Sequence, residues 1–505
     1  MISRFDKQHV VVLILCLVVY CATLSIRIYW ANAREAFHID ESLAYSMIFK
    51  DSYLPKSAYN QWKSGRDFKE LCIDNSNPTL RGFWADLKRL YFTTRATDHT
   101  NLFFIAFRLF LNMNKIDNFY KMRNYGIAFN CILFSISFLF FIIIYYKING
   151  SLSYALPPLL MLVFASNGSL AITLFIRMYQ IQQTMLLLLL IILLYLQNKF
   201  KNESSVSLLN IILFSISLSV LLLSGYFMLI FVFILLVFIF FKYKKKLCVI
   251  FSGILSLVFC FIGYHGYFNF LLSSRTTQAV DNISSLFISN IWRSIDNAPS
   301  VLSVLNGSYL LTLAIFFFSF YMAFKYFNLL RNNILFYCFI SGIASIILIY
   351  FLAYFKVYRY VSPFIILLYI PFFFFKPYKQ PISFYILIFF AILTLSNACI
   401  YPPDKVAPIQ SPIASYLNSY RNANVIFFYK DPDFCHQFLP VLPDSSKLYI
   451  ANSIDNAYNA IESSSKYILI LPRQAQIHSS LTPRVEKKFD DGIFSVYSVA
   501  PNISG

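Results

Sequence analysis

The 505-residue chain is 58% hydrophobic and 13% charged, and it carries a formal net charge of +19. Soluble domains carry about 25% charged residues, so the composition excludes an ordinary soluble protein and predicts a polytopic all-α membrane domain. Nucleic acid is excluded as a partner, because the excess positive charge lies largely in short loops between apolar runs. There it sets orientation and contacts membrane lipid.

Eleven apolar runs within residues 1–399 predict about eleven transmembrane helices. Several runs are shorter than the ~20 residues that a perpendicular helix needs. We expect the third run to be bent or partly re-entrant, because Pro157, Pro158 and the stretch 166–168 interrupt it. The expected spans are 9–29, 126–146, 154–173, 180–197, 206–223, 226–241, 247–268, 302–324, 334–354, 360–375 and 382–399.

The loop charges predict the orientation of the chain. Thirteen Lys and Arg residues lie on the side of the N-terminus, against five in the short loops of the other side. Cytoplasmic loops carry the excess of basic residues, so the N-terminus is predicted to be cytoplasmic. With an odd number of spans, the loop 30–125 and the tail 400–505 lie outside. In a bacterium this means the periplasm, and the membrane is the inner one.

The loop 30–125 contains ten of the fourteen acidic residues that precede residue 400. It also contains aromatic-rich amphipathic stretches such as 83–92, which we expect to be helices along the membrane interface. So many aromatic side chains favour a folded periplasmic cap over a flexible loop.

Residues 400–505 predict a small periplasmic α/β domain. We expect short buried strands over 424–429, 447–450 and 467–471, a helix over 453–463 and a hairpin over 485–499. This stretch has no phosphate-binding glycine loop. Cys72 and Cys435 lie in the outer segments, and the periplasm is oxidising, so a disulfide between them is left open.

Two adjacent carboxylates, Asp40 and Glu41, open the first outer loop. Charged groups next to lipid pay a desolvation cost, so they are retained mainly where they have a function. A structural interpretation is also available: Asp40 caps a helix and Glu41 sits in its first turn. The two interpretations are compatible.

The acid pair and three further motifs together resemble the GT-C superfamily of integral-membrane glycosyltransferases. These motifs are residues 97–104 (TDHTNLFF), 175–179 (FIRMY) and 358–363 (YRYVSP). In the first, Thr and Asn replace the family's prolines, and Asp98 adjoins the histidine. The size, the composition and the small outer tail look most like the O-antigen glucosyltransferases of serotype-converting bacteriophages.

The resemblance implies a sugar donor on undecaprenyl or another polyprenyl phosphate, and transfer to a glycan acceptor outside the membrane. A carboxylate then takes the proton of the acceptor hydroxyl, and single displacement inverts the anomeric configuration. Asp40 matches the family's first acid and is the candidate base. Glu41 would orient Asp40, bind acceptor hydroxyls or cap the helix.

The leaving phosphate needs fixed cations near the membrane surface. Arg177 and Arg359, in family-like contexts, are the candidates. Lys356 fits phosphate binding and ordinary snorkelling to lipid headgroups equally well. Asp98 and His99 are candidate sugar ligands or parts of a capped interfacial helix. Tyr179 is a candidate for stacking on sugar, with an aromatic belt at the interface as the alternative.

No certain cofactor follows from the sequence. A divalent metal is compatible with the many acids, although no ligand spacing requires one. The alternative functions are transfer to lipid A or protein by the same mechanism, a flippase of lipid-linked sugars, and a non-enzymatic assembly partner. If the phage-type resemblance holds, a small flippase and a polyprenyl-phosphate glucosyltransferase are expected alongside the protein.

Overall fold

The computed structural model divides into two compact units. The helical unit comprises Met1–Ala31, Arg89–Phe107 and Ile127–Asp404, and the sheet unit comprises Asn32–Lys88, Arg108–Gly126 and Lys405–Gly505. The structure describes residues 7–34, 37–49, 58–72, 78–92, 100–116, 118–201, 206–272, 287–353, 357–376, 378, 380–403, 412–420, 422–431, 434–435, 438–461, 465–477, 482–491 and 494–501.

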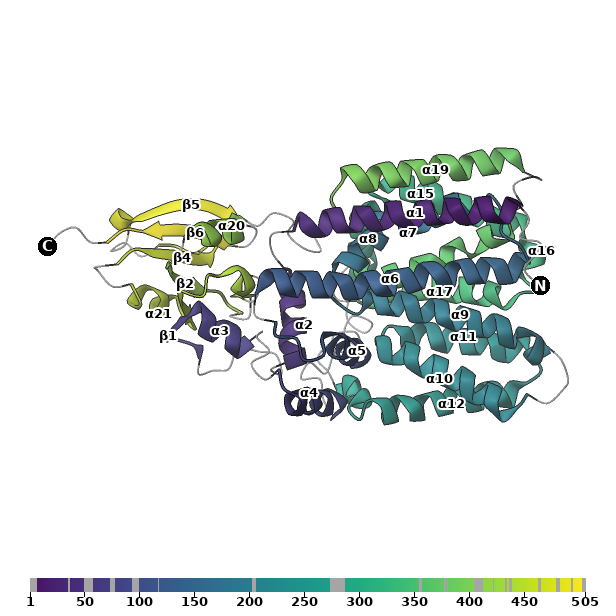
Figure 1. Cartoon of the computed structure of the whole chain (residues 1–505), viewed down its shortest axis with the longest axis horizontal. Helices are drawn as coiled ribbons and strands as arrows, with labels where there is room; N and C mark the ends of the chain where they lie inside the picture. Colours follow the sequence, from purple (N-terminus) through teal and green to yellow (C-terminus); the bar gives the residue numbers. More distant parts are fainter. Residues whose placement is uncertain are drawn as a thin grey trace. The chain divides into compact units, whose positions relative to one another are not determined.

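Long apolar helices form the helical unit. In Figure 1, α1 runs beside α6 and α19. The hydroxyls of Tyr20 and Ser135 join α1 to α6 at 2.8 Å, and the Trp30 indole donates to the carbonyl of Ala398 in α19, also at 2.8 Å. The helices are α1 (Lys7–Asn32), α6 (Phe119–Asn149), α9 (Tyr179–Lys201), α10 (Leu208–Ser224), α11 (Met228–Lys242), α12 (Lys246–Gly263), α15 (Tyr309–Lys325), α17 (Ile334–Leu352) and α19 (Pro381–Ile400).

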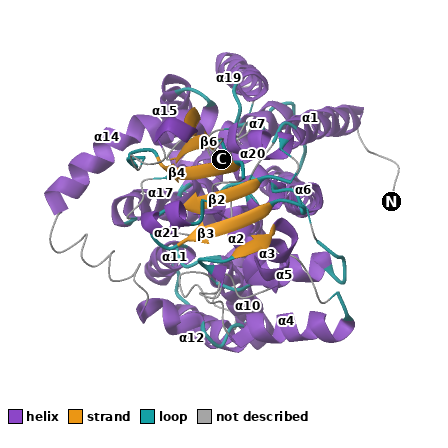
Figure 2. Cartoon of the chain, turned by 90° about the vertical axis from the view of Figure 1, so that its left-hand side faces the viewer, coloured by secondary structure: helices purple, strands orange, loops and turns teal. Residues whose placement is uncertain are grey.

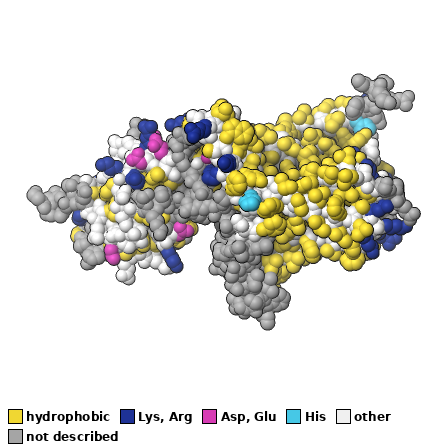
Figure 3. All heavy atoms as spheres, turned by 90° about the horizontal axis from the view of Figure 1, so that it is seen from below, with side chains coloured by type: hydrophobic (Ala, Val, Ile, Leu, Met, Phe, Trp, Pro, Cys, Tyr) yellow, Lys and Arg dark blue, Asp and Glu magenta, His cyan; other side chains and the backbone are white. Residues whose placement is uncertain are grey.

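Six helices in the described part of the chain are long and apolar enough to cross a membrane. The number of spans rises to eight if each of two bent helix pairs is counted as one further span. Figure 3 shows the hydrophobic side chains that cover this bundle, with Lys and Arg gathered at one end of it. The chain is therefore a multi-pass membrane protein. The expected spans 206–223, 226–241 and 360–375 coincide with shorter apolar helices, so the count of eleven stays a prediction.

The third predicted span is broken where the sequence indicated. Helix α7 (Leu156–Phe164) and helix α8 (Asn167–Leu174) meet at an angle of 56°. Ser166 is the cap of α8, because its hydroxyl accepts the backbone N–H of Ser169 at 3.2 Å. The expectation that Pro157 and Pro158 interrupt the helix was wrong: proline lies at the start of α7, where its fixed φ favours initiation.

A second bend of 83° separates Trp292–Asn306, the described end of α14 (Phe287–Asn306), from α15. Gly307 lies at this bend with φ of +73°, a conformation that side chains disfavour. The shorter elements of the unit are η2 (Tyr267–Leu272), α16 (Phe327–Leu330), η3 (Tyr358–Tyr360), α18 (Ser362–Ile365) and η4 (Ile366–Phe374).

A six-stranded sheet organises the other unit, with the order β1-β3-β2-β4-β6-β5. Figure 2 shows its strands β3, β2, β4 and β6 side by side. The central strands β3, β2 and β4 are parallel, and the remaining pairs are antiparallel. The predicted strands and hairpin of the tail are thus confirmed. The strands are β1 (Trp62–Ser64), β2 (Asn424–Phe428), β3 (Lys447–Ala451), β4 (Tyr467–Pro472), β5 (Val485–Asp491) and β6 (Phe494–Val499).

The first loop contributes directly to this sheet. Its strand β1 pairs with β3, and Trp62 lies opposite Tyr449. The ammonium of Lys69 in α3 binds the carboxylate of Asp444 at 2.8 Å. The described parts of the loop are therefore folded, as expected. Its helices are α2 (Ile39–Phe49), α3 (Gly65–Cys72), α4 (Leu80–Phe92), which covers the predicted amphipathic stretch, and α5 (Leu102–Leu111).

The tail adds two helices and two short 3₁₀ turns around the sheet. Helix α21 (Ile454–Asn459) lies where the sequence predicted it and packs on the core through Ala457. The other elements are α20 (Pro412–Ser419), η7 (Leu439–Val441) and η8 (Thr482–Arg484). Cys72 and Cys435 are both buried in this unit, and a disulfide between them stays a prediction.

Candidate functional site

The acid pair lies in the first turn of α2. The helix begins at Ile39, so Asp40 is its second residue and Glu41 its third. The position before the helix belongs to His38, whose ring Nδ1 accepts the backbone N–H of Asp40 at 3.2 Å. The expectation that Asp40 caps the helix was therefore wrong. His38 caps it, because an imidazole nitrogen with a lone pair can accept an amide proton as an Asn side chain does.

Glu41 is buried and paired. Its Oε2 accepts a hydrogen bond from Nη2 of Arg34 at 2.5 Å and another from the backbone N–H of His38 at 2.9 Å. The side chains of Arg34 and Glu41 are 1% and 0% exposed. The bond back to His38 is the carboxylate half of a capping box, so Glu41 both fixes the start of the helix and neutralises a buried cation.

Asp40 has the opposite environment. Its side chain is 28% exposed, and its Oδ2 lies 3.6 Å from Nδ1 of His38. A carboxylate of this kind reaches solvent and can exchange a proton with a bound hydroxyl. The two neighbouring acids therefore differ in environment: Glu41 is buried against Arg34, whereas the Asp40 carboxylate is partly exposed.

Further contacts hold this turn to the start of α6. The hydroxyl of Tyr45 donates to the carbonyl of Met122, and Nη1 of Arg123 donates to the carbonyl of Arg34 at 3.4 Å. The ring of Phe37 stacks on Tyr45 with centroids 6.2 Å apart. Burial is the first cause that raises the pKa of Tyr45 well above its usual range, and the nearby Glu41 adds to it.

The helical unit carries a second group of candidate residues, which we call the aromatic shelf: Phe175, Tyr179 and Tyr360. The rings of Phe175 and Tyr179 are stacked, with centroids 5.9 Å apart, and Tyr360 lies 6.3 Å from Tyr179. The guanidinium of Arg359 lies 5.1 Å from the centre of the Phe175 ring. Arg177 follows Phe175 by two residues and is buried. Two motifs 180 residues apart thus meet here.

An asparagine that the sequence reasoning missed positions this turn. Asn130 in α6 donates from Nδ2 to the carbonyls of Thr173 and Phe175, both at 2.9 Å. The Thr173 carbonyl lies in the last turn of α8, and the carbonyl of Phe175, which also accepts the backbone N–H of Arg177 at 2.8 Å, follows that helix. A lone Asn inside an apolar run was the signal in the sequence, since such a residue needs a hydrogen-bonding partner.

Three predicted site residues, Asp98, His99 and Lys356, lie outside the described residues. Their roles stay predictions. Among the residues that the structure does describe, no group of three or more His, Cys, Asp and Glu side chains is arranged to hold a metal ion. We assign no metal to the site.

Arg27 is a buried cation that sequence reasoning also missed. It lies within α1, is 0% exposed, and donates to Thr173 Oγ1, Ser169 Oγ and the carbonyls of Thr23 and Phe164. The Phe164 carbonyl ends α7, so Arg27 satisfies a group that the break between α7 and α8 exposes. Arg27 therefore stabilises the bend between α7 and α8.

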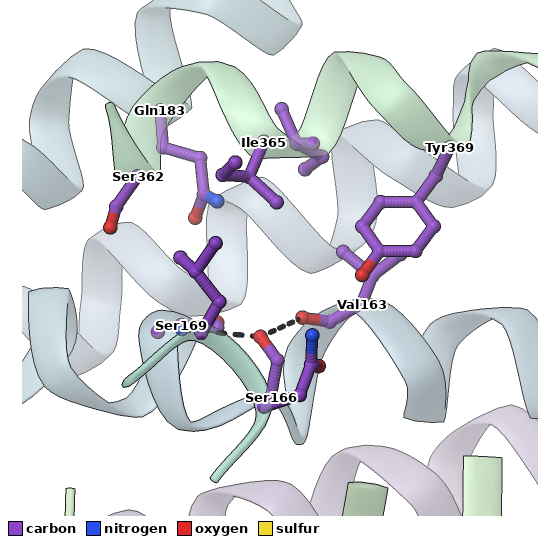
Figure 4. A pocket seen from close by; sticks show the side chains of 11 residues that line it. Val163, Ser166, Ser169, Gln183, Ser362, Ile365 and Tyr369 are labelled. Atoms are coloured by element: carbon purple, nitrogen blue, oxygen red, sulfur yellow. Dashed lines mark hydrogen bonds between the residues drawn. The ribbon is translucent and has the colours of Figure 1, made fainter. Parts of the chain in front are cut away.

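A small polar cavity adjoins this bend. Figure 4 shows Ser166, Ser169 and Gln183 on one side and Tyr369 on the other. The cavity measures about 10 Å³, which is room for about one water molecule and excludes a sugar or a phosphate. The hydroxyl of Tyr369 is buried and, among the described residues, has no hydrogen-bond partner.

The predicted fold class, a polytopic helical membrane domain with a small C-terminal α/β domain, is confirmed, and the fold is similar to that of two solved structures. The chain is similar to the structure of ArnT from Cupriavidus metallidurans bound to undecaprenyl phosphate, with a TM-score of 0.54 and 11% identity over 97% of this chain and 98% of that one. The chain is also similar to the structure of ArnT from Cupriavidus metallidurans in the apo state, with a TM-score of 0.51 and 10% identity over 97% of this chain and 98% of that one. No family model matches the chain, and no curated protein matches its sequence.

Proposed function

We propose that the chain is an inverting glycosyltransferase that moves a sugar from a polyprenyl-phosphate-linked donor to a surface glycan, and that the sugar is glucose. The acceptor in this proposal is the O-antigen of lipopolysaccharide, at the periplasmic face of the inner membrane. The bound undecaprenyl phosphate of the similar ArnT structure supports the class of donor. Transfer to lipid A or to protein is the alternative acceptor choice.

The observation that carries the proposal is the contrast between Asp40 and Glu41. Glu41 is fully buried against Arg34, and this pair anchors the first turn of α2. The anchored turn presents the half-buried carboxylate of Asp40, the next residue back along the chain. A rigidly held and accessible carboxylate is what a general base requires.

In the proposed step, the carboxylate of Asp40 takes the proton of the acceptor hydroxyl. The hydroxyl oxygen forms a bond to the anomeric carbon while the bond from that carbon to the phosphate oxygen breaks. Polyprenyl phosphate leaves with the electron pair, so a β-linked donor yields an α-linked product. Glu41 takes no proton in this scheme, because its Oε2 already accepts hydrogen bonds from Arg34 and His38.

The growing charge on the leaving phosphate needs cations. Arg177 and Arg359 are the proposed ones, since Arg177 lies in the turn between α8 and α9 and Arg359 lies in η3, the two segments that contribute the aromatic shelf. Stacking on Phe175 restricts the guanidinium of Arg359, which lowers the entropy lost when it binds an anion. Tyr179 completes the shelf and is the proposed contact for the sugar or for the carrier lipid.

The proposed orientation follows the basic residues at helix ends. Lys147 lies in the last turn of α6, Lys201 ends α9, and Lys242 and Lys325 end α11 and α15. If the eleven expected spans alternate, these four ends all face the same side. The excess of basic residues assigns that side to the cytoplasm, which leaves Asp40 and the C-terminus in the periplasm.

The test is to express the wild type and Asp40→Asn in a smooth Gram-negative host that makes polyprenyl-phosphate glucose. A small flippase and a polyprenyl-phosphate glucosyltransferase are supplied as proposed partners. The O-polysaccharide is then analysed by mass spectrometry and NMR. Asp455→Asn is the matched control, because Asp455 is also the second residue of a helix, follows an Ile and lies in the same unit.

The proposal expects an added hexose per repeat with the wild type and with Asp455→Asn, and none with a membrane-inserted Asp40→Asn. A hexose with all three proteins would remove Asp40 as the base. With the same host, sugar found on lipid A or on protein instead of the O-polysaccharide would correct the acceptor. No glycan change anywhere would refute the transferase.

A further inference from the structure

Helix α14 leaves the bundle almost at a right angle to a lipid-facing helix. Its described part, Trp292–Asn306, meets α15 at 83°, and the exposed side chains of α15 include Leu310 and Phe317. Figure 2 shows α14 extending sideways from the helical unit. Because the apolar helix α15 belongs to a candidate membrane span, a helix at 83° to it runs close to the plane of the membrane.

Hydrogen bonds to three helices fix this geometry. At the bend, Nδ2 of Asn306 donates to Oγ1 of Thr312 in α15 at 3.1 Å, and the carbonyl of Asn306 accepts a hydrogen bond from Nδ2 of Asn397 in α19 at 2.8 Å. Near the other end of the described part, the hydroxyl of Tyr350 in α17 donates to the carbonyl of Ser294 at 3.0 Å. The direction of α14 is therefore set by the fold of its own unit.

The side chains of α14 divide into three strips. One strip is buried against the bundle, and the two exposed strips differ in polarity. We call the exposed ones the apolar strip, made of Trp292, Ile295 and Pro299, and the polar strip, made of Arg293, Asp296 and Ser300. At about 100° per residue, each exposed strip spans about 60° of the helix surface, and the two lie side by side. The buried strip consists of Ser294, Val301 and Leu305.

The two exposed strips fit neither water alone nor hydrocarbon alone. Trp292 and Ile295 are 62% and 52% exposed, which is unfavourable in water. Arg293 and Asp296 carry charges on the exposed side, and such charges are costly in hydrocarbon. Pro299 has no backbone N–H, so the carbonyl of Ile295 lacks its helical hydrogen bond, which is also costly in hydrocarbon. The boundary between water and lipid satisfies both strips.

We infer that α14 is an interfacial helix whose apolar strip binds the membrane at the level of the lipid headgroups and glycerol, with the polar strip in water. Tryptophan is enriched at this level because its ring is amphipathic. Only Gly307 and Ser308 separate α14 from α15, so the surface that contacts lipid extends from the span onto α14. Helix α14 also packs on α8 and η3, which flank the aromatic shelf, so its contact with the interface holds these segments at a fixed depth.

The assay measures the depth of Trp292 by fluorescence quenching, with the full-length protein in vesicles of phosphatidylethanolamine and phosphatidylglycerol. The quenchers are lipids brominated near the glycerol end of the acyl chain, lipids brominated near the chain end, and acrylamide in the water. The signal of Trp292 is the difference between the wild type and Trp292→Phe, because the chain contains four tryptophans. We expect the shallow lipids to remove most of this signal, and the deep lipids and acrylamide to remove little of it.

Ile295→Asp and Ser300→Asp are matched variants, because both add a carboxylate to an exposed position of the same helix. Ile295→Asp should abolish the quenching of Trp292 by the shallow lipids, since a charge in the apolar strip draws this part of the helix into water. Ser300→Asp adds the same charge to the polar strip and should keep the wild-type quenching. Each variant is compared with its own Trp292→Phe counterpart, and unchanged thermal unfolding in detergent shows that the fold is intact.

Stronger quenching by the deep lipids would place α14 in the hydrocarbon as half of a re-entrant loop and would overturn the inference. Quenching by acrylamide alone would place the apolar strip in water, and quenching by none of the three would show that protein, such as a second copy of the chain, covers it. Either result would overturn the inference as well. Equal effects of Ile295→Asp and Ser300→Asp would refute the assignment of the two strips. If Ile295→Asp fails to fold, the quenching of the wild type still decides. The assay involves no sugar transfer, so its outcome is independent of the proposed function.

Discussion

Replacement of Glu41 by Gln is expected to destabilise the start of α2. Glutamine still offers an oxygen to the backbone N–H of His38, but it removes the carboxylate that accepts Nη2 of Arg34 at 2.5 Å. Both side chains are almost fully buried, so the arginine cannot turn to water for compensation. Breaking a buried ion pair by removal of one partner costs about 3–5 kcal/mol. The retained cap and the ring of Phe37, 5.2 Å from the Arg34 guanidinium, place the expected cost near 3 kcal/mol.

The assay is thermal unfolding of purified protein in detergent, followed by the loss of the folded peak in size-exclusion chromatography. Glu41→Gln should lower the midpoint by several degrees. Asp40→Asn, the same change one residue earlier, should leave it unchanged, because the Asp40 side chain is partly exposed. The double variant Arg34→Met with Glu41→Gln should recover part of the loss, since no uncompensated charge remains buried. Equal midpoints for the wild type and Glu41→Gln would refute the anchoring role of this pair.

Three further predictions concern the scaffold. Gly65→Ala should destabilise the sheet unit by about 1–3 kcal/mol, because a Cβ there would lie 2.4 Å from the backbone carbonyl oxygen of Pro443; unchanged thermal unfolding would contradict this. Arg27→Met should sharply reduce the yield of folded protein in detergent. Arg27→Lys should give a similarly low yield, because one ammonium cannot replace a guanidinium that donates to four oxygens. A normal yield of the Met variant would contradict this. The Ser495 hydroxyl, followed by Lys487, lowers the pKa of Asp490. This stabilisation is present above the ordinary pKa of an aspartate and is lost as the pH falls through the lowered pKa. Ser495→Ala should therefore shift acid unfolding to higher pH, which fluorescence measurements below about pH 4 would detect. Superimposable unfolding curves of the two proteins would contradict this.

Local sequence patterns were sufficient to predict much of the fold. The strands β2, β3 and β4 are short continuous runs of buried residues, and the break at Ser166 combines a capping side chain with the following glycine. These features depend on residues within one element. The strand β1 could not be predicted in this way, because Trp62–Ser64 is too short to show a period and exists only through its pairing with β3.

The candidate site was predictable in its residues and less so in their roles. The position of Glu41 in the first turn of a helix followed from sequence, whereas Asp40, which was expected to cap that helix, is its second residue. The assignment of Glu41 to Arg34 did not follow from sequence, because the two residues lie seven positions apart across the turn before α2. The cap by His38 was missed for a different reason: histidine is not among the preferred capping residues, and its role depends on which ring nitrogen faces the amide.

Arg27 and Arg359 of the helical unit lie in different surroundings: Arg27 is fully buried, whereas Arg359 is partly buried. The guanidinium of Arg27 donates to four neutral oxygens, which belong to Thr23, Phe164, Ser169 and Thr173. These hydrogen bonds stabilise the break between α7 and α8. An anion could reach Arg27 only by opening that bend. Arg359 instead lies over the ring of Phe175 and belongs to η3, a short 3₁₀ turn after α17, so binding an anion there requires no opening of a helix. A cation that binds and releases a leaving group in every cycle belongs at such a turn, which is why the proposed phosphate contacts are at the aromatic shelf and the buried charge of α1 is assigned to the fold.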